Sequence, residues 1–184
     1  MGLHLSETFD NIIEILSRNK KIMDLMDLPT VLPTDTAVIK AQKLNQVIKQ
    51  CITKTAESPE ALGEKMGSVK IGDTVYDKFG KIRMTISAAQ STALKVPEFG
   101  NQRIDICIYY NNQADSEKAI KILDLISDTL SNEELKVKWQ DDEGNMHTMY
   151  RTLESGFLLS QIASIDNYER VGMRYFFYNS YYNK

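Results

Sequence analysis

Two histidines and two cysteines are the residues of this sequence best suited to nucleophilic or metal chemistry. The histidines are His4 and His147, and the cysteines are Cys51 and Cys107. Neither histidine has a second ligand at a spacing typical of zinc sites, and the cysteines form no CxxC pair. Cys107 and His147 could act as a thiol nucleophile and its base. We favour buried packing for both cysteines, because Cys107 alternates inside a predicted strand.

Three consecutive carboxylates, Asp141, Asp142 and Glu143, could serve a glycosidase or a metal site. The longer stretch DDEGN is also a typical hairpin-turn sequence, and no carboxylate partner elsewhere is indicated. A solvated turn is therefore the favoured interpretation. The glycines of GDTVYDKFGK lack the spacing of phosphate-binding loops. We therefore expect no catalytic residue, no cofactor and no metal site, and a protein that is not an enzyme.

The C-terminal stretch MRYFFYNSYYNK is rich in aromatic residues. Aromatic and basic side chains together can stack on single-stranded nucleic acid. In a strand, Tyr175 and Phe177 share one face of the sheet and Phe176 and Tyr178 the other, so at least one pair must be buried. Aromatic residues on the remaining face more often belong to a protein interface. The predicted interface candidates are Tyr175, Phe176, Phe177, Tyr178 and Arg174, with Asp141, Asp142 and Glu143 of the acidic turn.

Composition limits the possible partners. A length of 184 residues favours one domain, or one domain with an appended helical segment. The formal net charge of −3 argues against a general binder of nucleic acid or anionic membranes, which would normally be basic. The N-terminus has no secretion-signal pattern, and no apolar run reaches membrane-spanning length. We therefore expect a soluble protein that works, or is assembled, inside a cell.

The N-terminal third is predicted to be helical. A helix starting near Ser6 has an apolar stripe of Phe9, Ile12, Ile13 and Leu16, and Pro29 and Pro33 end it and form an extended connector. Thr34 or Asp35 is predicted to cap a second helix. The apolar face of that helix comprises Val38, Ile39, Leu44, Val47, Ile48 and Ile52. A polar joint at 56–68 then separates a helical segment, 1–62, from an α+β domain, 68–184.

From Val69 the hydrophobic pattern has a period of two. The pattern predicts two strands around a turn at 78–80, a long loop at 88–101 and a strand at 103–110. One face of the second strand comprises Ile82, Met84 and Ile86, and the other Lys81, Arg83 and Thr85. In the strand at 103–110 the inward face comprises Ile104, Ile106, Ile108 and Tyr110, and the other face Arg103, Asp105, Cys107 and Tyr109. Arg103 and Asp105 are expected to tolerate alanine unless their face meets another subunit.

A helix capped by Asp115 or Ser116 follows, and its predicted buried stripe comprises Ala119, Ile122, Leu123, Ile126 and Leu130. A hairpin around DDEGN and two final strands joined at Asp166–Asn167 come after it. The strands come in consecutive sets, which is typical of an α+β fold: a mostly antiparallel sheet covered by a helix on one face, with an N-terminal two-helix segment.

Several segments carry a family resemblance through their order and lengths. They are the meander with GKIRMTISA, the long polar loop, the strand RIDICIYY, the covering helix DSEKAIKILDLISDTL, and the closing pair GFLLSQIASIDNYERVGMRYFFY. In this order, the part from Val69 to Tyr178 resembles the tail terminator (tail completion) proteins of long-tailed bacteriophages. The two N-terminal helices exceed what the shortest members of that family carry.

The resemblance implies a structural virion protein. Such proteins form a ring, usually of six subunits, at the head-proximal end of the tail, where the ring stops tail-tube polymerisation and joins the tail to the head connector. The implied partners are other copies of the chain, the tail tube protein, and head connector or neck proteins, with no membrane and no specific nucleic acid. Another neck protein, such as a head-closure or adaptor protein, is an alternative. A small hydrolase or ligand-binding domain using Cys107 or Asp141–Glu143 is a further one.

Overall fold

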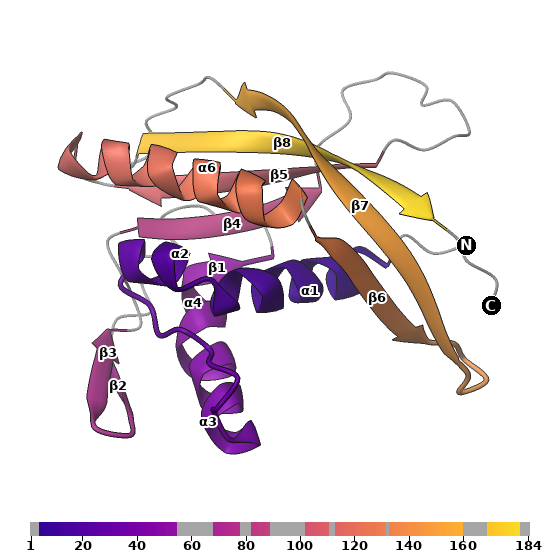
Figure 1. Ribbon diagram of the computed structural model, residues 1–184, viewed down its shortest axis with the longest axis horizontal. Helices are drawn as coiled ribbons and strands as arrows, with labels where there is room; N and C mark the ends of the chain where they lie inside the picture. The colour runs from indigo at the N-terminus through magenta and orange to yellow at the C-terminus, as the bar shows by residue number, and fades with distance from the viewer. Residues whose placement is uncertain are drawn as a thin grey trace.

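The computed structural model describes residues 4–54, 68–77, 82–88, 102–110, 113–131, 133–159 and 169–180. Within these ranges the predicted α+β fold is confirmed: a curled, mostly antiparallel sheet is covered by helices (Figure 1). The main sheet has the spatial order β1-β4-β5-β8-β7-β6, and only the β1–β4 pair is parallel. Its strands are β1 (Ile52–Thr53), β4 (Ile82–Ala88), β5 (Gln102–Tyr110), β6 (Glu134–Gln140), β7 (Met146–Leu159) and β8 (Glu169–Ser180).

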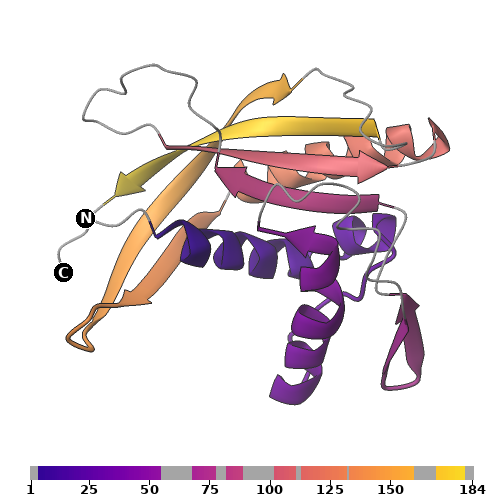
Figure 2. The ribbon, with the colours of Figure 1, turned by 180° about the vertical axis from the view of Figure 1, so that it is seen from behind.

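The helices form two groups. The first comprises α1 (Leu5–Arg18), α2 (Lys20–Leu25) and α6 (Ser116–Ser131), which follows a 3-10 turn at Gln113–Asp115. In this group α6 crosses the sheet, and α1 lies within the curve of β6 and β7 (Figure 1). The second comprises α3 (Ala37–Gln42), a π-helix (Lys43–Ile48) and α4 (Lys49–Cys51), which lead into β1 (Figure 2). A separate hairpin is formed by β2 (Ser68–Ile71) and β3 (Thr74–Asp77).

The buried faces of several elements follow the predicted periodicity. The apolar stripe of α6 is buried, as is the face of β5 beneath it, because residues three or four apart share a helix face and alternate residues share a strand face. Met84 and Ile86 of β4 continue the buried surface beside Ile108 and Ile106. The confirmed buried residues are Phe9, Ile12, Ile13 and Leu16 in α1, Ile104, Ile106, Ile108 and Tyr110 in β5, and Ala119, Ile122, Leu123, Ile126 and Leu130 in α6.

The first predicted helix is in fact two helices. α1 begins at Leu5, and Asn19 separates it from α2. The Asn19 side chain accepts hydrogen bonds from the backbone N–H groups of Lys21, at 3.1 Å, and Ile22, at 3.3 Å. This is N-cap geometry, which gives a new helix its start. The apolar stripe continues across the break, because Ile22 and Met26 are also buried.

The predicted cap of the second helical segment is wrong. Thr36 is the N-cap, and its hydroxyl accepts from the N–H of Ile39 at 3.3 Å. Asp35 instead accepts from the N–H of Leu32 at 2.8 Å and pairs with Lys43, whose Nζ lies 2.7 Å from Oδ2. The predicted apolar face is also wrong at its start, since Val38 is 67% exposed.

The strand boundaries differ from prediction in three places. The first predicted strand contains its own turn at Gly72, whose φ of 61° suits glycine, so β2 and β3 form a separate hairpin. Ile52, predicted to lie on the apolar face of a helix, forms β1 together with Thr53. The strands predicted on either side of Ser155 are one strand, β7, with a bulge between Ser155 and Phe157. The predicted turns at 78–80 and 166–167 and most of the 88–101 loop lie outside the described residues.

Both predicted segments contribute to one hydrophobic core. Ile12 of α1, Val47 of the π-helix and Ile122 of α6 belong to the same buried cluster. Buried Arg151 of β7 also donates a hydrogen bond to Thr8 of α1. The N-terminal helices therefore complete the core of the sheet. The predicted division at 63–67 falls outside the described residues and stays a prediction.

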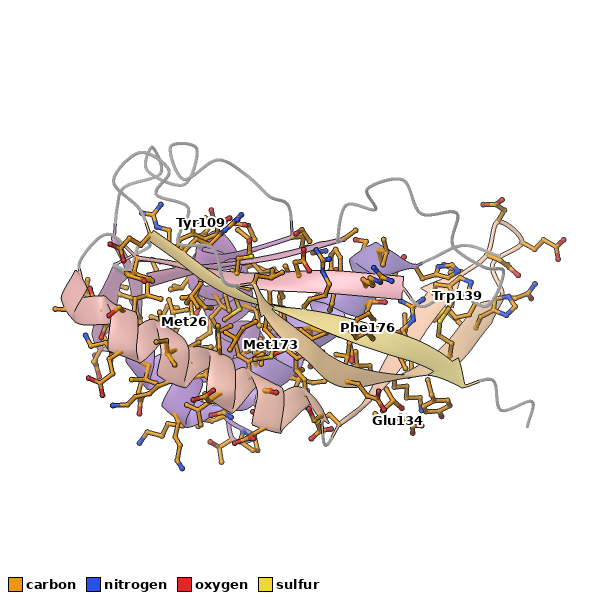
Figure 3. All side chains as sticks on the ribbon, turned by 90° about the horizontal axis from the view of Figure 1, so that it is seen from above. Met26, Tyr109, Glu134, Trp139, Met173 and Phe176 are labelled. Carbon is orange, nitrogen blue, oxygen red and sulfur yellow. The ribbon has the colours of Figure 1, made fainter. Side chains whose placement is uncertain are left out.

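The opposite face of β4 and β5 is more polar, and part of it is also buried. Arg83 and Thr85 point to this side as predicted, yet both are buried, together with Cys107 and Tyr109. Tyr109 lies on the side of the sheet away from α6 (Figure 3). The alternation of polar and apolar residues thus predicted the direction of these side chains and not their burial.

Candidate assembly interface

β8 contains most of the predicted interface residues, but one of them, Tyr175, belongs to the core. It lies opposite Ile104 of β5, on the face covered by α6, and is fully buried. Burial raises the pKa of its phenol above the ordinary range. The prediction that Tyr175 lies at an interface with another subunit is therefore wrong.

Phe176 points to the opposite face and covers a glycine. A Cβ atom added to Gly156, in the bulge of β7, would lie 2.9 Å from Cδ2 of Phe176 and 2.9 Å from the carbonyl oxygen of Arg174. The guanidinium of Arg103 lies 5.4 Å from the centre of the Phe176 ring. The half-buried ring is thus packed within the chain, and only part of it can meet a partner.

Arg174 is held by a carboxylate of the same chain. Its Nε lies 2.7 Å from Oδ1 of Asp105, and its Nη2 lies 2.8 Å from Oδ2. The two side chains are 20% and 15% exposed, so the pair is largely shielded from water. The hydrogen bonds to Asp105 raise the pKa of Arg174 further. A bidentate pair of this kind fixes the guanidinium in one orientation.

The side chains of Phe177 and Tyr178 lie outside the described residues, although their backbone belongs to β8. Phe177 pairs with Leu153 of β7, and Tyr178 pairs with Thr152. This pairing places the aromatic end of β8 against the middle of β7.

The acidic stretch forms the predicted hairpin turn between β6 and β7. One carboxylate oxygen of Asp141 accepts from the N–H groups of Glu143, at 3.0 Å, and Asn145, at 2.8 Å. The other lies 2.7 Å from Nε2 of His147. The hydrogen bond from His147, followed by that from Asn145, lowers the pKa of Asp141 to about 2. Asp141 therefore organises the turn, and the exposed side chains of Asp142 and Glu143 are left for solvent or a partner.

Trp139 lies between two imidazole rings near the end of this hairpin. Its ring centre is 4.1 Å from that of His4 and 5.3 Å from that of His147, and both pairs are stacked. The pairing with His147 could have been read from the sequence, because a hairpin closed by DDEGN places the two residues opposite each other. The contact with His4 could not, since nothing in the sequence aligns α1 with β6.

The predicted interface residues form two separate groups. Thr152, which is level with Tyr178, lies six positions along β7 from Met146, beside the acidic turn. At about 3.3 Å per residue this corresponds to roughly 20 Å of strand. The turn and the aromatic end of β8 are therefore neighbours along one strand and not one site.

Cys107 and His147 are not brought together. Cys107 lies opposite Gly172, which is level with Leu159, whereas His147 lies at the other end of β7. The separation corresponds to roughly 40 Å of strand. Burial raises the pKa of the Cys107 thiol to about 11, which disfavours the thiolate. The geometry therefore does not support a thiol–imidazole pair.

No cluster of three or more His, Cys, Asp or Glu residues that could hold a metal ion occurs in the described ranges. None of the helices described there is long and apolar enough to cross a membrane. Comparison with models of known protein families gives no match, and comparison with curated protein sequences gives none either.

Proposed function

We propose that this chain is a non-enzymatic structural protein that forms a closed ring at the head-proximal end of a phage tail. There it ends polymerisation of the tail tube and joins the tail to the head connector. The observation that carries the proposal is the β6–β7 hairpin, which extends from the body of the molecule past the N-terminal end of α1 (Figure 1). The overall α+β fold is compatible with the family resemblance of the sequence.

The hairpin suits a contact with a neighbouring copy because its turn is acidic and the middle of its outer strand, β6, carries lysines. Asp142 and Glu143 are exposed at the turn, and Lys136 and Lys138 are exposed along β6. Opposite charges at different places on one surface favour a heterologous contact, in which the turn of one copy meets β6 of the next. A heterologous contact that closes after a fixed rotation gives a ring.

The position of β6 supports the same proposal. It is the last strand of the described sheet, and edge strands must be protected or paired. Asn11 of α1 donates to the carbonyl oxygen of Lys136 at 3.4 Å, which covers one backbone group of this edge. The exposed lysines of β6 discourage strand pairing with unrelated sheet edges, but they can still pair with the carboxylates of a neighbouring copy.

A head-closure or adaptor protein would form the same kind of ring, so position in the virion distinguishes the candidates. Antibody labelling of purified virions should locate the chain at the junction between tail tube and head connector. If the chain is a tail terminator, phage particles assembled without it should have overlong tails that lack heads. If the chain is a head-closure protein, tails formed without it should have normal length, and that outcome would overturn the terminator assignment.

The ring contact is tested by charge reversal. Asp142→Lys with Glu143→Lys should abolish rings seen by electron microscopy and light scattering, because the lysines of the next copy then face lysines. Adding Lys136→Glu and Lys138→Glu to the same chain should restore them, since the reversed groups again attract. Rings that persist in the first variant would show that the hairpin does not join the copies.

A further inference from the structure

Two helices that pack together carry nearly the same five residues. α2 contains Lys-Ile-Met-Asp-Leu at 21–25, and α6 contains Lys-Ile-Leu-Asp-Leu at 121–125. Their environments match position by position. The lysine and the aspartate are exposed, the second and third residues are buried, and the final leucine is half-buried. The second and third residues of each segment belong to the core, so the lysine, aspartate and leucine form equivalent surfaces on the two helices.

These helices run antiparallel. At one end the amide of Asn19 donates to the hydroxyl of Thr129 at 2.8 Å. At the other end Asp27 is close enough to Lys118 to act on its ammonium group. Between these points lies a shallow groove of about 530 Å³. The groove is lined by Lys21, Asp24, Leu25, Lys121, Asp124 and Leu125.

The antiparallel arrangement makes the charges alternate around the groove. Lys21 and Asp124 lie toward one end of the groove, and Asp24 and Lys121 lie toward the other end. Among the described residues no salt bridge crosses the groove, and Lys121 pairs with Glu117 of its own helix at 2.7 Å. The two leucines between these charges remain partly exposed.

An alternating arrangement of four charges is complementary to itself. When a second copy is turned by half a rotation about an axis lying in this surface, every lysine faces an aspartate. This holds whether the axis runs along the helices or across the groove. Twofold contacts require such self-complementary patches.

We propose that this groove binds the same groove of a second copy, giving a twofold dimer of the free chain. Leu25 and Leu125 of both copies form its centre, and lysine–aspartate pairs form its rim. Ile120, which is 51% exposed and four residues before Asp124, adds apolar area on the same face of α6. The dimer does not depend on the proposed ring, since the ring contact uses the β6–β7 hairpin.

The rim charges should give orientation more than affinity, because exposed ion pairs contribute little and are screened by salt. The contact area around six groove residues is also small compared with stable interfaces. We therefore expect a dimer that dissociates at low protein concentration and weakens as salt is added.

Two charge variants test the proposal. Asp24→Lys with Asp124→Lys makes all four groove charges positive, and Lys21→Asp with Lys121→Asp makes all four negative. In sedimentation over a concentration series, the wild-type chain should form the twofold dimer, and neither variant alone should form it. An equimolar mixture of the two variants should dimerise again, because the grooves then have opposite charge. This outcome does not depend on the direction of the twofold axis.

The hairpin variant Asp142→Lys with Glu143→Lys is the matched control, since it changes the net charge by the same amount outside the groove. It should dimerise like the wild-type chain, while the all-positive groove variant should still form any rings that the wild type forms. Circular dichroism should show that each variant is folded. A wild-type chain that stays monomeric throughout, or a dimer unaffected by both groove variants, would overturn the proposal.

Discussion

Gly172 of β8 lies directly against the thiol of Cys107 in β5. A Cβ atom at position 172 would lie 2.8 Å from Sγ of Cys107 and 3.1 Å from the carbonyl oxygen of Ile106. The centre of the sheet is thus packed so closely that the smallest side chain is required at one position and a small one at the other.

Gly172→Ala should lower the free energy of unfolding by about 1–3 kcal/mol, because the added methyl group must displace its neighbours. Cys107→Ala should recover part of this loss, since it removes the sulfur that the methyl group meets. A double-mutant cycle by chemical denaturation measures the coupling between the two positions. Additive effects would show that the strain lies at the Ile106 carbonyl.

Ile106→Ala and Ile122→Ala should each lower the free energy of unfolding by about 2–5 kcal/mol, from lost burial and the cavity left behind. Ile106 of β5 and Ile122 of α6 both belong to the core between the sheet and this helix. Denaturant midpoints check this, with the exposed Arg103→Ala as the control. Equal shifts for Ile106→Ala and Arg103→Ala would contradict the inward assignment.

The sequence suggested that Asp105, on the other face of β5, would tolerate alanine unless that face meets another subunit. Its bidentate pair with Arg174 changes that expectation. Asp105→Ala should cost about 1–3 kcal/mol, because it leaves a largely buried guanidinium without its carboxylate. Thermal denaturation of Asp105→Ala and Asp105→Asn checks this, and the asparagine variant should lose less. Wild-type stability in the alanine variant would show that solvent replaces the carboxylate.

Asp141→Asn should lower stability at neutral pH and have less effect in acid. The pKa of Asp141 is held at about 2, below its unfolded value, so its stabilising effect is present above about pH 4 and is lost as the pH falls through about 2. Melting curves of both proteins, followed by the fluorescence of Trp139, should therefore converge toward pH 2. A constant gap between the curves would contradict the role of Asp141 in the turn.

Cys107 should resist alkylation at pH 8 in the native protein. A thiol with a pKa of about 11 is thiolate in only about one molecule in a thousand at that pH, and this thiol is also buried. Mass spectrometry after iodoacetamide treatment should show modification of Cys107 only once denaturant unfolds the chain. Rapid labelling of the native protein would reopen the enzymatic interpretation, as would a turnover lost in Cys107→Ser.

Periodicity predicted which faces of the elements are buried, because burial and repeat follow directly from backbone geometry. All five predicted residues of the α6 stripe are buried, and the hairpin around Asp141 forms where its turn residues predicted it. Pairing partners were harder to predict. Ile52 reads as the end of a helix, and only its register with Met84 makes it a strand.

The interface prediction failed at Tyr175 for a related reason. Alternation separates Tyr175 from Phe176, but it cannot decide which of the two faces α6 covers. Arg83 is the converse case, because a charged residue in an alternating strand is normally exposed, yet here it is buried. The groove between α2 and α6 was also missed, although its repeated segments were visible in the sequence. Recognising it requires knowing that the two helices are neighbours.

The unbroken course of β7 has a mechanical consequence. One continuous backbone runs from the hairpin turn along β7, and it pairs with β8 from Tyr150 to Leu159, on both sides of the bulge at Gly156. The hydrogen bonds between antiparallel strands lie perpendicular to the strand direction. A pull on the turn along β7 therefore loads many of these bonds in shear at the same time. Tension applied at the hairpin is carried straight into the core of the subunit, with no intervening linker to yield first.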